Sequence, residues 1–231
     1  MKHIAIVLAG GKGSRMNSDI PKQYMQLNGK PVIYYSLKAF EESMIDEIVL
    51  VAGKEDIELC ENDIVKKYGF EKVVGVVEGG TERYYSVLNG LRAVDECDFV
   101  YIHDGARPCI DRGVIQRCIS AVQQFDACVA AMPVKDTIKV VDKEGFSVGT
   151  PDRATLWQIQ TPQCFRYSLV KDAYENMAAD GNRGNITDDA MVVERYTDTK
   201  VKMVEGSYEN IKITTPEDIF VAERFLRTDS E

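Results

Sequence analysis

The residues best suited to chemistry lie in a glycine-rich segment, Leu8-Ala9-Gly10-Gly11-Lys12-Gly13-Ser14-Arg15-Met16. This segment follows directly on Ile4–Ala9, an apolar run typical of a buried strand. Glycines leave backbone N–H groups open to approach, and open α/β sheets bind ligands just beyond the carboxyl ends of their parallel strands. The segment therefore predicts a phosphate-binding loop, for which an ordinary tight turn is the alternative interpretation.

Two familiar phosphate loops do not fit this segment. A Walker A loop requires Gly-Lys followed by Ser or Thr, but Lys12 is followed by Gly13. A dinucleotide fingerprint requires glycine or alanine at the position of Met16. It also requires a ribose-binding acid about 20 residues further on, whereas the next notable group after the loop is the basic Lys22. Arg15 and Lys22 suit a triphosphate better than a nicotinamide dinucleotide, which disfavours a dehydrogenase. A solvated lysine is the alternative for Lys22.

A carboxylate follows a second apolar run, Phe99–His103, within His103-Asp104-Gly105-Ala106-Arg107-Pro108. At a strand tip that faces a phosphate loop, Asp104 can hold Mg²⁺, which takes one or two carboxylates together with phosphate oxygens. An Asx turn is the alternative for this residue. Arg107 can bind a second phosphate or pair with an acid. We interpret His103 as a satisfied strand-end histidine, because the proposed chemistry requires no base.

Further polar residues stand at predicted element boundaries. Gly79-Gly80-Thr81-Glu82-Arg83-Tyr84-Tyr85-Ser86 leads into a predicted helix. Ser86 either caps that helix or contacts a base or ribose, and the sequence alone favours capping. Each of the remaining groups has a structural explanation when taken singly: Arg153, Thr161-Pro162-Gln163, Thr187-Asp188-Asp189 and Lys212.

The elements that must position these residues alternate between short apolar runs and amphipathic segments. This alternation predicts an α/β fold with a mostly parallel central sheet flanked by helices. The predicted strands are Ile4–Ala9, Ile48–Ala52, Val73–Val77, Phe99–His103, Ala127–Val134, Val201–Val204 and Ile211–Thr214. Two helices are expected near Tyr167–Met177 and Thr187–Arg195. Three further helices are predicted from apolar faces formed by Val87, Leu88, Leu91 and Val94, by Val114, Ile115, Cys118, Ile119, Val122 and Phe125, and by Ile219, Phe220, Ala222, Phe225 and Leu226.

The stretch at about 135–160 breaks this alternation. Lys135–Val141 alternates polar and apolar residues, Asp142–Gly145 is typical of a turn, and Phe146–Thr150 can return as a second strand. Such a hairpin has little of its own to bury, so we expect an arm that packs against a second subunit. A surface hairpin without a partner is the alternative. We expect one domain, residues 1–231, with this projecting β-hairpin arm.

Composition excludes several classes of protein. The 231 residues carry 28 Lys and Arg against 37 Asp and Glu, a formal net charge of −9, which argues against a nucleic-acid surface. No apolar stretch reaches the roughly 18 residues that a membrane helix needs. Two histidines, and six cysteines without a C-x-x-C pair, argue against a zinc site. We expect a cytoplasmic protein with reduced thiols that binds neither nucleic acid nor membrane.

Taken together, eight segments in order resemble the 2-C-methyl-D-erythritol 4-phosphate cytidylyltransferase family nearly from end to end. These segments are Leu8–Met16, Pro21-Lys22-Gln23-Tyr24, Gly79–Arg83, His103–Pro108, Pro133-Val134-Lys135-Asp136-Thr137, Leu156–Gln163, Thr187-Asp188-Asp189-Ala190 and Asn210-Ile211-Lys212-Ile213-Thr214. The resemblance implies a Rossmann-like nucleotidyltransferase fold and a homodimer joined by its arms. It also implies transfer of CMP from CTP to the sugar phosphate, with Mg²⁺ or another divalent cation as cofactor.

The resemblance also implies a role for each candidate residue. The catalytic group comprises Arg15, Lys22, Asp104 and Lys212, with Asp104 at the metal. The nucleotide-binding group comprises Ala9, Gly10, Gly11, Gly13, Gly80, Thr81, Ser86 and Gly105. The group that binds the sugar phosphate comprises Arg107, Thr137, Arg153, Thr161 and Thr187, with Thr137 and Arg153 on the arm and facing the neighbouring subunit's site.

One position departs from the family pattern. Gly10 stands where the family more often has alanine, and glycine there is closer to the ribitol-5-phosphate cytidylyltransferases. Leu156-Trp157 and the acid at Asp189 instead favour the methylerythritol phosphate enzymes. Ribitol 5-phosphate is therefore the alternative acceptor.

Overall fold

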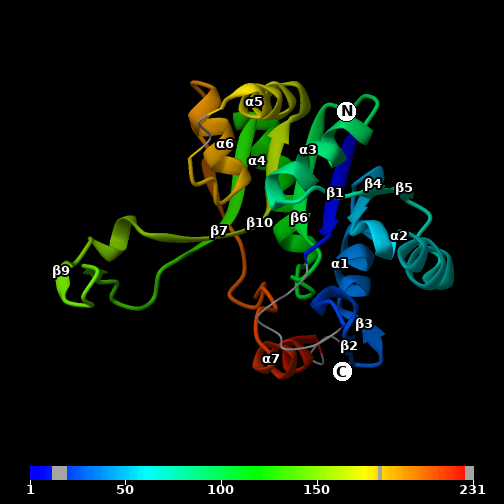
Figure 1. The fold of residues 1–231 in the computed structure, drawn as a ribbon, viewed down its shortest axis with the longest axis horizontal. Helices are drawn as coiled ribbons and strands as arrows, with labels where there is room; N and C mark the ends of the chain where they lie inside the picture. The colour runs from blue at the N-terminus through cyan, green and yellow to red at the C-terminus, as the bar shows by residue number, and fades with distance from the viewer. Residues whose placement is uncertain (12–19, 182–183, 227–231) are drawn as a thin grey trace.

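The computed structural model describes residues 1–11, 20–181 and 184–226. Its centre is a seven-stranded sheet in the order β11-β7-β10-β6-β1-β4-β5 (Figure 1). The strands are β1 (His3–Ala9), β4 (Glu47–Ala52), β5 (Val73–Glu78), β6 (Phe99–Asp104), β7 (Ala127–Pro133), β10 (Trp157–Arg166) and β11 (Lys202–Glu205). Neighbours pair in parallel except at β10, which runs antiparallel to both β6 and β7. The mostly parallel sheet is confirmed.

The central strands are apolar on both faces because helices cover both faces. In β1, Ala5 and Val7 pack into one hydrophobic core, whereas Ile4 and Ile6 pack into a second. The first core includes side chains of α1 (Val32–Glu41) and α4 (Arg112–Phe125). The second includes side chains of α3 (Arg83–Ala93), α5 (Tyr167–Ala179) and α6 (Asp189–Tyr196). The sheet is therefore the middle layer of three.

Shorter elements surround these layers. Beside β1 and β4 lie η2 (Lys22–Tyr24), the two-stranded sheet of β2 (Gln26–Leu27) and β3 (Lys30–Pro31), η3 (Lys54–Asp56), α2 (Ile57–Leu59) and η4 (Cys60–Lys66). The last helix, α7 (Glu217–Leu226), forms a small third core in which Leu27, Val32 and Ala222 are buried. Among the described residues, no helix has the length and apolar character required to cross a bilayer.

The predicted hairpin projects away from the sheet (Figure 1). Its strands are β8 (Val140–Val141) and β9 (Ser147–Gly149), which pair antiparallel, and η5 (Arg153–Thr155) follows them. The Asp142 carboxylate closes the turn by accepting backbone N–H groups of Glu144 and Phe146 at 3.0 and 2.9 Å. The arm is shorter than expected, because the chain from Trp157 onward pairs with β7 in the central sheet.

Three sequence-based expectations are wrong. Ile211–Thr214 forms no strand; the Ile213 N–H instead donates to the carbonyl of Ala106 in a loop, at 2.8 Å. Phe125 is 41% exposed because it is the last residue of α4, where the helix leaves the core. Phe220 is 72% exposed on α7, where Ala222 carries the burial instead.

Candidate active site

A cavity of about 750 Å³ lies at the carboxyl edge of the sheet. It is bordered by residues at or just after the ends of β1, β4, β5 and β6, where α/β sheets bind ligands. Eight of the predicted site residues line it: Gly10, Gly11, Lys22, Gly80, Thr81, Ser86, Asp104 and Lys212. The fold thus brings together groups that lie up to about 200 positions apart in the chain.

Asp104, the last residue of β6, is the most constrained group in this cavity. Its two carboxylate oxygens accept from Lys212 Nζ at 2.7 Å and from Arg83 Nε at 3.1 Å. Burial acts to raise the pKa of Asp104, but the nearby positive charges of Arg83, Lys212 and Arg107 outweigh it and hold the pKa well below its usual range. Asp104 therefore remains an anion with cations on both sides.

Arg83 continues this network behind the cavity. Its Nη1 and Nη2 atoms donate to the two carboxylate oxygens of Asp189, at 2.8 and 2.9 Å. The Tyr174 hydroxyl donates to the same carboxylate, which is fully buried. Burial opposes the charge on Arg83, yet Asp189 and Asp104 raise its pKa well above the ordinary value. A bidentate pair of this kind fixes the guanidinium and, through it, Asp104.

Gln23 shapes the start of the glycine loop. Its side-chain amide, only 2% exposed, donates to the carbonyls of Ala9 and Gly11, the latter at 3.2 Å. Lys22 precedes Gln23 in the short helix η2 and lines the cavity. The amide contacts therefore tie Lys22 to the loop that it faces.

Ser86 organises the second glycine segment. Its hydroxyl accepts the Gly80 N–H at 3.0 Å and donates to the Glu82 carbonyl at 3.2 Å. Because Ser86 lies inside α3, whose N-cap is Glu82, the preference for helix capping is wrong. A Cβ on Gly80 would lie 2.2 Å from the Tyr85 Cβ, so this close approach requires glycine.

The segment that carries Lys212 is fixed by backbone contacts from three directions. Asn210 donates its amide to the Thr161 carbonyl at 2.8 Å, and the Ile213 N–H donates to Ala106. Arg107 Nη1 donates to the Asn210 carbonyl at 2.7 Å, and its buried Nε has no hydrogen-bond partner among the residues that the structure describes. Arg107 is thus placed behind Lys212, and it is not among the residues that line the cavity.

His103 is satisfied at both ring nitrogens. The Arg107 carbonyl can only accept, so His103 Nε2 donates to it at 3.3 Å. In the neutral ring Nδ1 is then an acceptor, and the Thr161 hydroxyl donates to it at 3.0 Å while accepting the Asp104 backbone N–H at 3.1 Å. Burial lowers the pKa of His103 to about 4. The neutral ring confirms the interpretation of a structural histidine and gives Thr161 a positioning contact with Asp104.

The remaining predicted residues that the structure describes are not among those that line the cavity. Thr137, Arg153 and Thr187 are exposed, and Arg153 Nη1 donates to the Lys135 carbonyl at 2.8 Å within the arm. Gly105 backs onto β1, because a Cβ there would lie 2.9 Å from the Leu8 carbonyl oxygen. Gly13 and Arg15 fall outside the described residues.

Sequence reasoning missed three residues that hold the site together. Arg83 and Gln23 stood within recognised segments without a role, and Asp189 counted only as part of a motif. A glutamine that closely follows a glycine-rich loop, as Gln23 does, is a sequence signal that could have indicated a side chain holding that loop in place. The Arg83–Asp189 pair gave no local signal, since 106 positions separate the two residues.

Glycines, two lysines and a carboxylate paired with cations lie together at the carboxyl edge of an α/β sheet, an arrangement that suits an enzyme acting on phosphorylated ligands, such as a nucleotidyltransferase. The 2-C-methyl-D-erythritol 4-phosphate cytidylyltransferase family model matches residues 3–228, and the chain belongs to this family.

Known relatives are similar to this chain over nearly its whole length. The 2-C-methyl-D-erythritol 4-phosphate cytidylyltransferase of Lachnospira eligens is 58% identical over 96% of this chain and 98% of its own length. That of Caldanaerobacter subterraneus subsp. tengcongensis is 48% identical over 96% and 98%. Among solved structures, 4-diphosphocytidyl-2C-methyl-D-erythritol synthase from Anaerococcus prevotii superposes with a TM-score of 0.85 at 36% identity, over 98% of this chain and 96% of that one. These names support methylerythritol phosphate over ribitol phosphate as the acceptor.

Proposed function

We propose that this chain transfers CMP from CTP to 2-C-methyl-D-erythritol 4-phosphate and releases pyrophosphate. Family membership supports the reaction. The single structural observation that supports the site is the Asp104 carboxylate, held between Lys212 and Arg83 in a cavity shared with Gly10 and Lys22. Such a cavity combines glycines, which allow close approach of a phosphate, with positively charged side chains, and a triphosphate requires both.

The reaction is an in-line attack by a phosphate monoester oxygen on the α-phosphorus of CTP. The new P–O bond forms as the bond to the pyrophosphate leaving group breaks. A monoester carries roughly −1.5 to −2 charges at pH 7, so the nucleophile arrives deprotonated and no general base is required. The buried and neutral His103 agrees with a mechanism that has no base.

Catalysis then depends on bringing two anions together. Lys22 and Lys212 both line the cavity and supply positive charge to it, and Arg15 is proposed to add to that charge from the glycine loop. Positioned charges of this kind stabilise the charge that develops on the α-phosphate and the leaving group. Local basic groups thereby offset the acidic balance of the whole chain.

The cavity also fits a divalent cation. Asp104 is an ionised carboxylate in the cavity wall, and Mg²⁺ typically takes one or two carboxylates plus phosphate oxygens. We propose Mg²⁺ as cofactor, held by Asp104 and the bound phosphates, where it would neutralise phosphate charge. Both Asp104 oxygens already accept from Lys212 and Arg83, so the ion would share this carboxylate with them.

The acceptor site is proposed to span two chains. Thr137 and Arg153 lie on an arm whose apolar side chains are exposed, which suits an interface between copies of this chain. We propose a homodimer in which these two residues bind the sugar phosphate of the partner's site. Arg107, Thr161 and Thr187, none of which is among the residues that line the cavity, are proposed to complete that binding.

The test is pyrophosphate release from CTP with each acceptor in turn. We expect rapid release with 2-C-methyl-D-erythritol 4-phosphate, strict dependence on a divalent cation, and little release with ribitol 5-phosphate. Asp104→Asn serves as the matched variant, since it keeps the size of the side chain and removes its charge. Faster pyrophosphate release with ribitol 5-phosphate than with 2-C-methyl-D-erythritol 4-phosphate would contradict the proposal. A lack of release with both acceptors would contradict it as well.

A further inference from the structure

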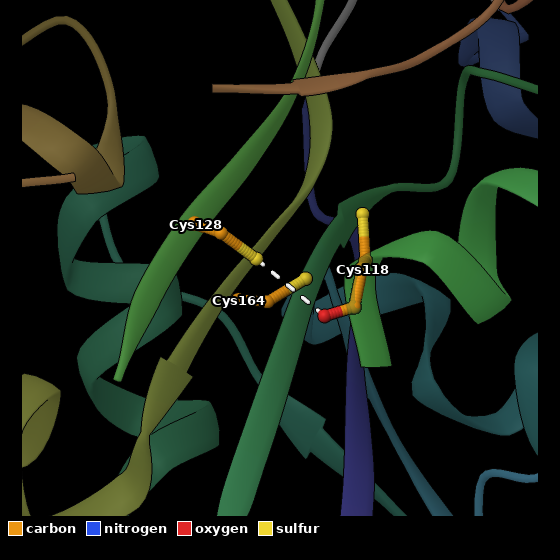
Figure 2. Close-up of side chains that lie close together, drawn as sticks. All are labelled: Cys118, Cys128 and Cys164. Atoms are coloured by element: carbon orange, nitrogen blue, oxygen red, sulfur yellow. Dashed lines mark hydrogen bonds between the residues drawn. The ribbon is translucent and has the colours of Figure 1, made fainter. Parts of the chain in front are cut away.

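Three cysteines from different elements converge in the core behind the sheet. Cys118 lies on α4, Cys128 on β7 and Cys164 on β10, and their sulfur atoms all lie within 4.8 Å of one another (Figure 2). All three side chains are fully buried and are thiols rather than disulfides. We refer to them as the cysteine triad. Their spacing along the sequence matches no metal motif, which is why only the fold reveals them.

Two pairing contacts fix the triad. Cys128 and Cys164 stand directly opposite each other in the β7–β10 ladder. The Cys128 thiol donates to the Cys118 carbonyl at 3.5 Å, which joins the sheet to α4. A metal–thiolate bond is about 2.3 Å long, so three sulfurs around one centre lie roughly 3.5 to 4 Å apart. The triad needs only a small contraction to reach that spacing.

The number of ligands and the polarity around the triad determine which metal or metalloid could bind there. Among the described residues, no fourth His, Cys, Asp or Glu joins the group, so a four-coordinate zinc site is incomplete. The triad belongs to the hydrophobic core between the sheet and α4, where a net charge is costly. A complex of three thiolates with Zn²⁺ has a net charge of −1, and the complex with Cu⁺ has a net charge of −2. The complex of three thiolates with a trivalent centre is neutral.

We propose that the cysteine triad is a binding site for trivalent arsenic or antimony, taken up as the neutral hydroxide. In the reaction, As(OH)₃ and three thiols give As(SR)₃ and three waters. Each S–As bond forms as one As–O bond breaks, and each thiol proton leaves with the departing hydroxide as water. Arsenic keeps its oxidation state throughout. Neutral reactants thus give a neutral product, as an apolar core requires.

Burial raises the pKa of the Cys164 thiol well above its usual range, so this group enters the reaction as a thiol. Its protonation agrees with a reaction in which each thiol proton leaves as part of a water molecule.

Occupation of the triad would reach the active site through β10. Cys164 lies three residues beyond Thr161, whose hydroxyl accepts the Asp104 N–H. Cys164 also pairs with Tyr101, three residues before Asp104 on β6. Drawing the three sulfurs together therefore displaces β10, which contacts Asp104 through Thr161 and pairs with β6. Because the triad is enclosed, entry requires α4 to open, and binding should be slow.

The test uses arsenite with the folded wild-type protein under anaerobic, reductant-free conditions, followed by intact-mass spectrometry. We expect a mass gain of one arsenic atom less three hydrogens, with slow onset. Cys118→Ala, Cys128→Ala and Cys164→Ala should each lose that adduct and bind arsenite roughly 100-fold more weakly, because one of three linked bonds is missing. Cys97→Ala and Cys109→Ala are the matched controls and should keep the three-bond adduct.

If a triad variant fails to fold, arsenic-edge X-ray absorption on the wild-type adduct decides the matter, since three sulfur neighbours and no oxygen are expected. A wild-type protein that forms no adduct while folded overturns the proposal. So does an adduct with only one or two S–As bonds, or one that survives the loss of a triad cysteine. An adduct that appears only in urea shows that the triad is simple core packing.

Discussion

The cavity and the arm break the usual rules of burial in opposite ways. In and behind the cavity wall, charged groups are buried: Asp104, which lines the cavity, is only 8% exposed, and Asp189 behind it is 0% exposed. On the arm, apolar groups are exposed, with Phe146 at 68% and Val148 at 63%. Buried charges persist here because each has an opposite partner, whereas the apolar groups of the arm are not covered by any of the described residues. The comparison is why we propose anion binding at the cavity and a subunit interface at the arm.

Breaking the buried network should produce the largest effect. Asp189→Ala removes the bidentate partner of Arg83 and leaves a largely buried guanidinium without its main counter-charge. We expect a loss of about 3 kcal/mol in the free energy of unfolding, measured by urea titration. The control is Glu175→Ala, which breaks the exposed Arg92–Glu175 pair of 2.6 Å and should cost less than about 1 kcal/mol. Equal costs for the two variants would refute a structural role for the buried network.

Removing charge from the cavity should act on rate rather than on stability. Lys22→Ala is expected to lower kcat by roughly two to three decades, the scale of losing one preorganised transition-state contact. Lys66→Ala, in which the lysine bonds Asn62 on the surface, is the control and should leave turnover unchanged. Turnover of the Lys22 variant close to that of the wild type would remove this lysine from the mechanism.

The arm should contribute to the binding of the sugar phosphate and not to the binding of CTP. Arg153→Ala is expected to raise the KM for the sugar phosphate roughly ten- to a hundred-fold, the scale of one charged hydrogen bond, with little change for CTP. Steady-state kinetics with each substrate varied in turn measures the difference.

Mixing the two variants tests whether the site is shared. When Arg153→Ala and Lys22→Ala dimers exchange subunits, one of the two sites in each mixed dimer would contain both intact residues. We expect partial recovery of activity. No recovery in mixed dimers that are verified by mass would show that each chain completes its own site.

The smallest effect concerns pH. Because the folded-state pKa of Asp104 is depressed, its ionisation contributes stability that is fully present above its ordinary pKa of about 4 and is lost as the pH falls toward the folded-state value. Lys212→Met removes one cation and raises that pKa. We expect the variant to be about 1 kcal/mol less stable than the wild type at neutral pH, with the difference shrinking below about pH 4. Urea titrations across this range measure it, and a constant difference would exclude the ionisation of Asp104 as the cause.

Sequence reasoning succeeded where structure is set by neighbours in the chain. The apolar run Ile4–Ala9 and the face of Val87, Leu88 and Leu91 are buried as predicted, because pattern alone tells which side of a strand or helix meets the core. The glycine and carboxylate positions at strand ends were also found, since parallel strands bring their carboxyl ends to one edge.

It failed where structure is set by distant partners. Strand β10 contains Gln158, Gln160 and Gln163, so its sequence has no apolar run that predicts a buried strand. Its position depends instead on pairing with β6 and β7. The segment Ile211–Thr214 has the composition of a strand, but its backbone bonds go to a loop. The Arg83–Asp189 pair needs the finished fold before its charges meet.

The reversed direction of β10 has a consequence for where the arm is rooted. Chain leaving β7 at Pro133 returns as Trp157, and these two residues are register partners at the carboxyl edge. A parallel strand in that place would have forced the chain across the sheet to the opposite rim before it could re-enter. The antiparallel direction of β10 therefore places both ends of the arm at the carboxyl edge of the sheet, the edge that also carries the cavity, so the proposed dimer contact at its tip needs no long connection back to the sheet.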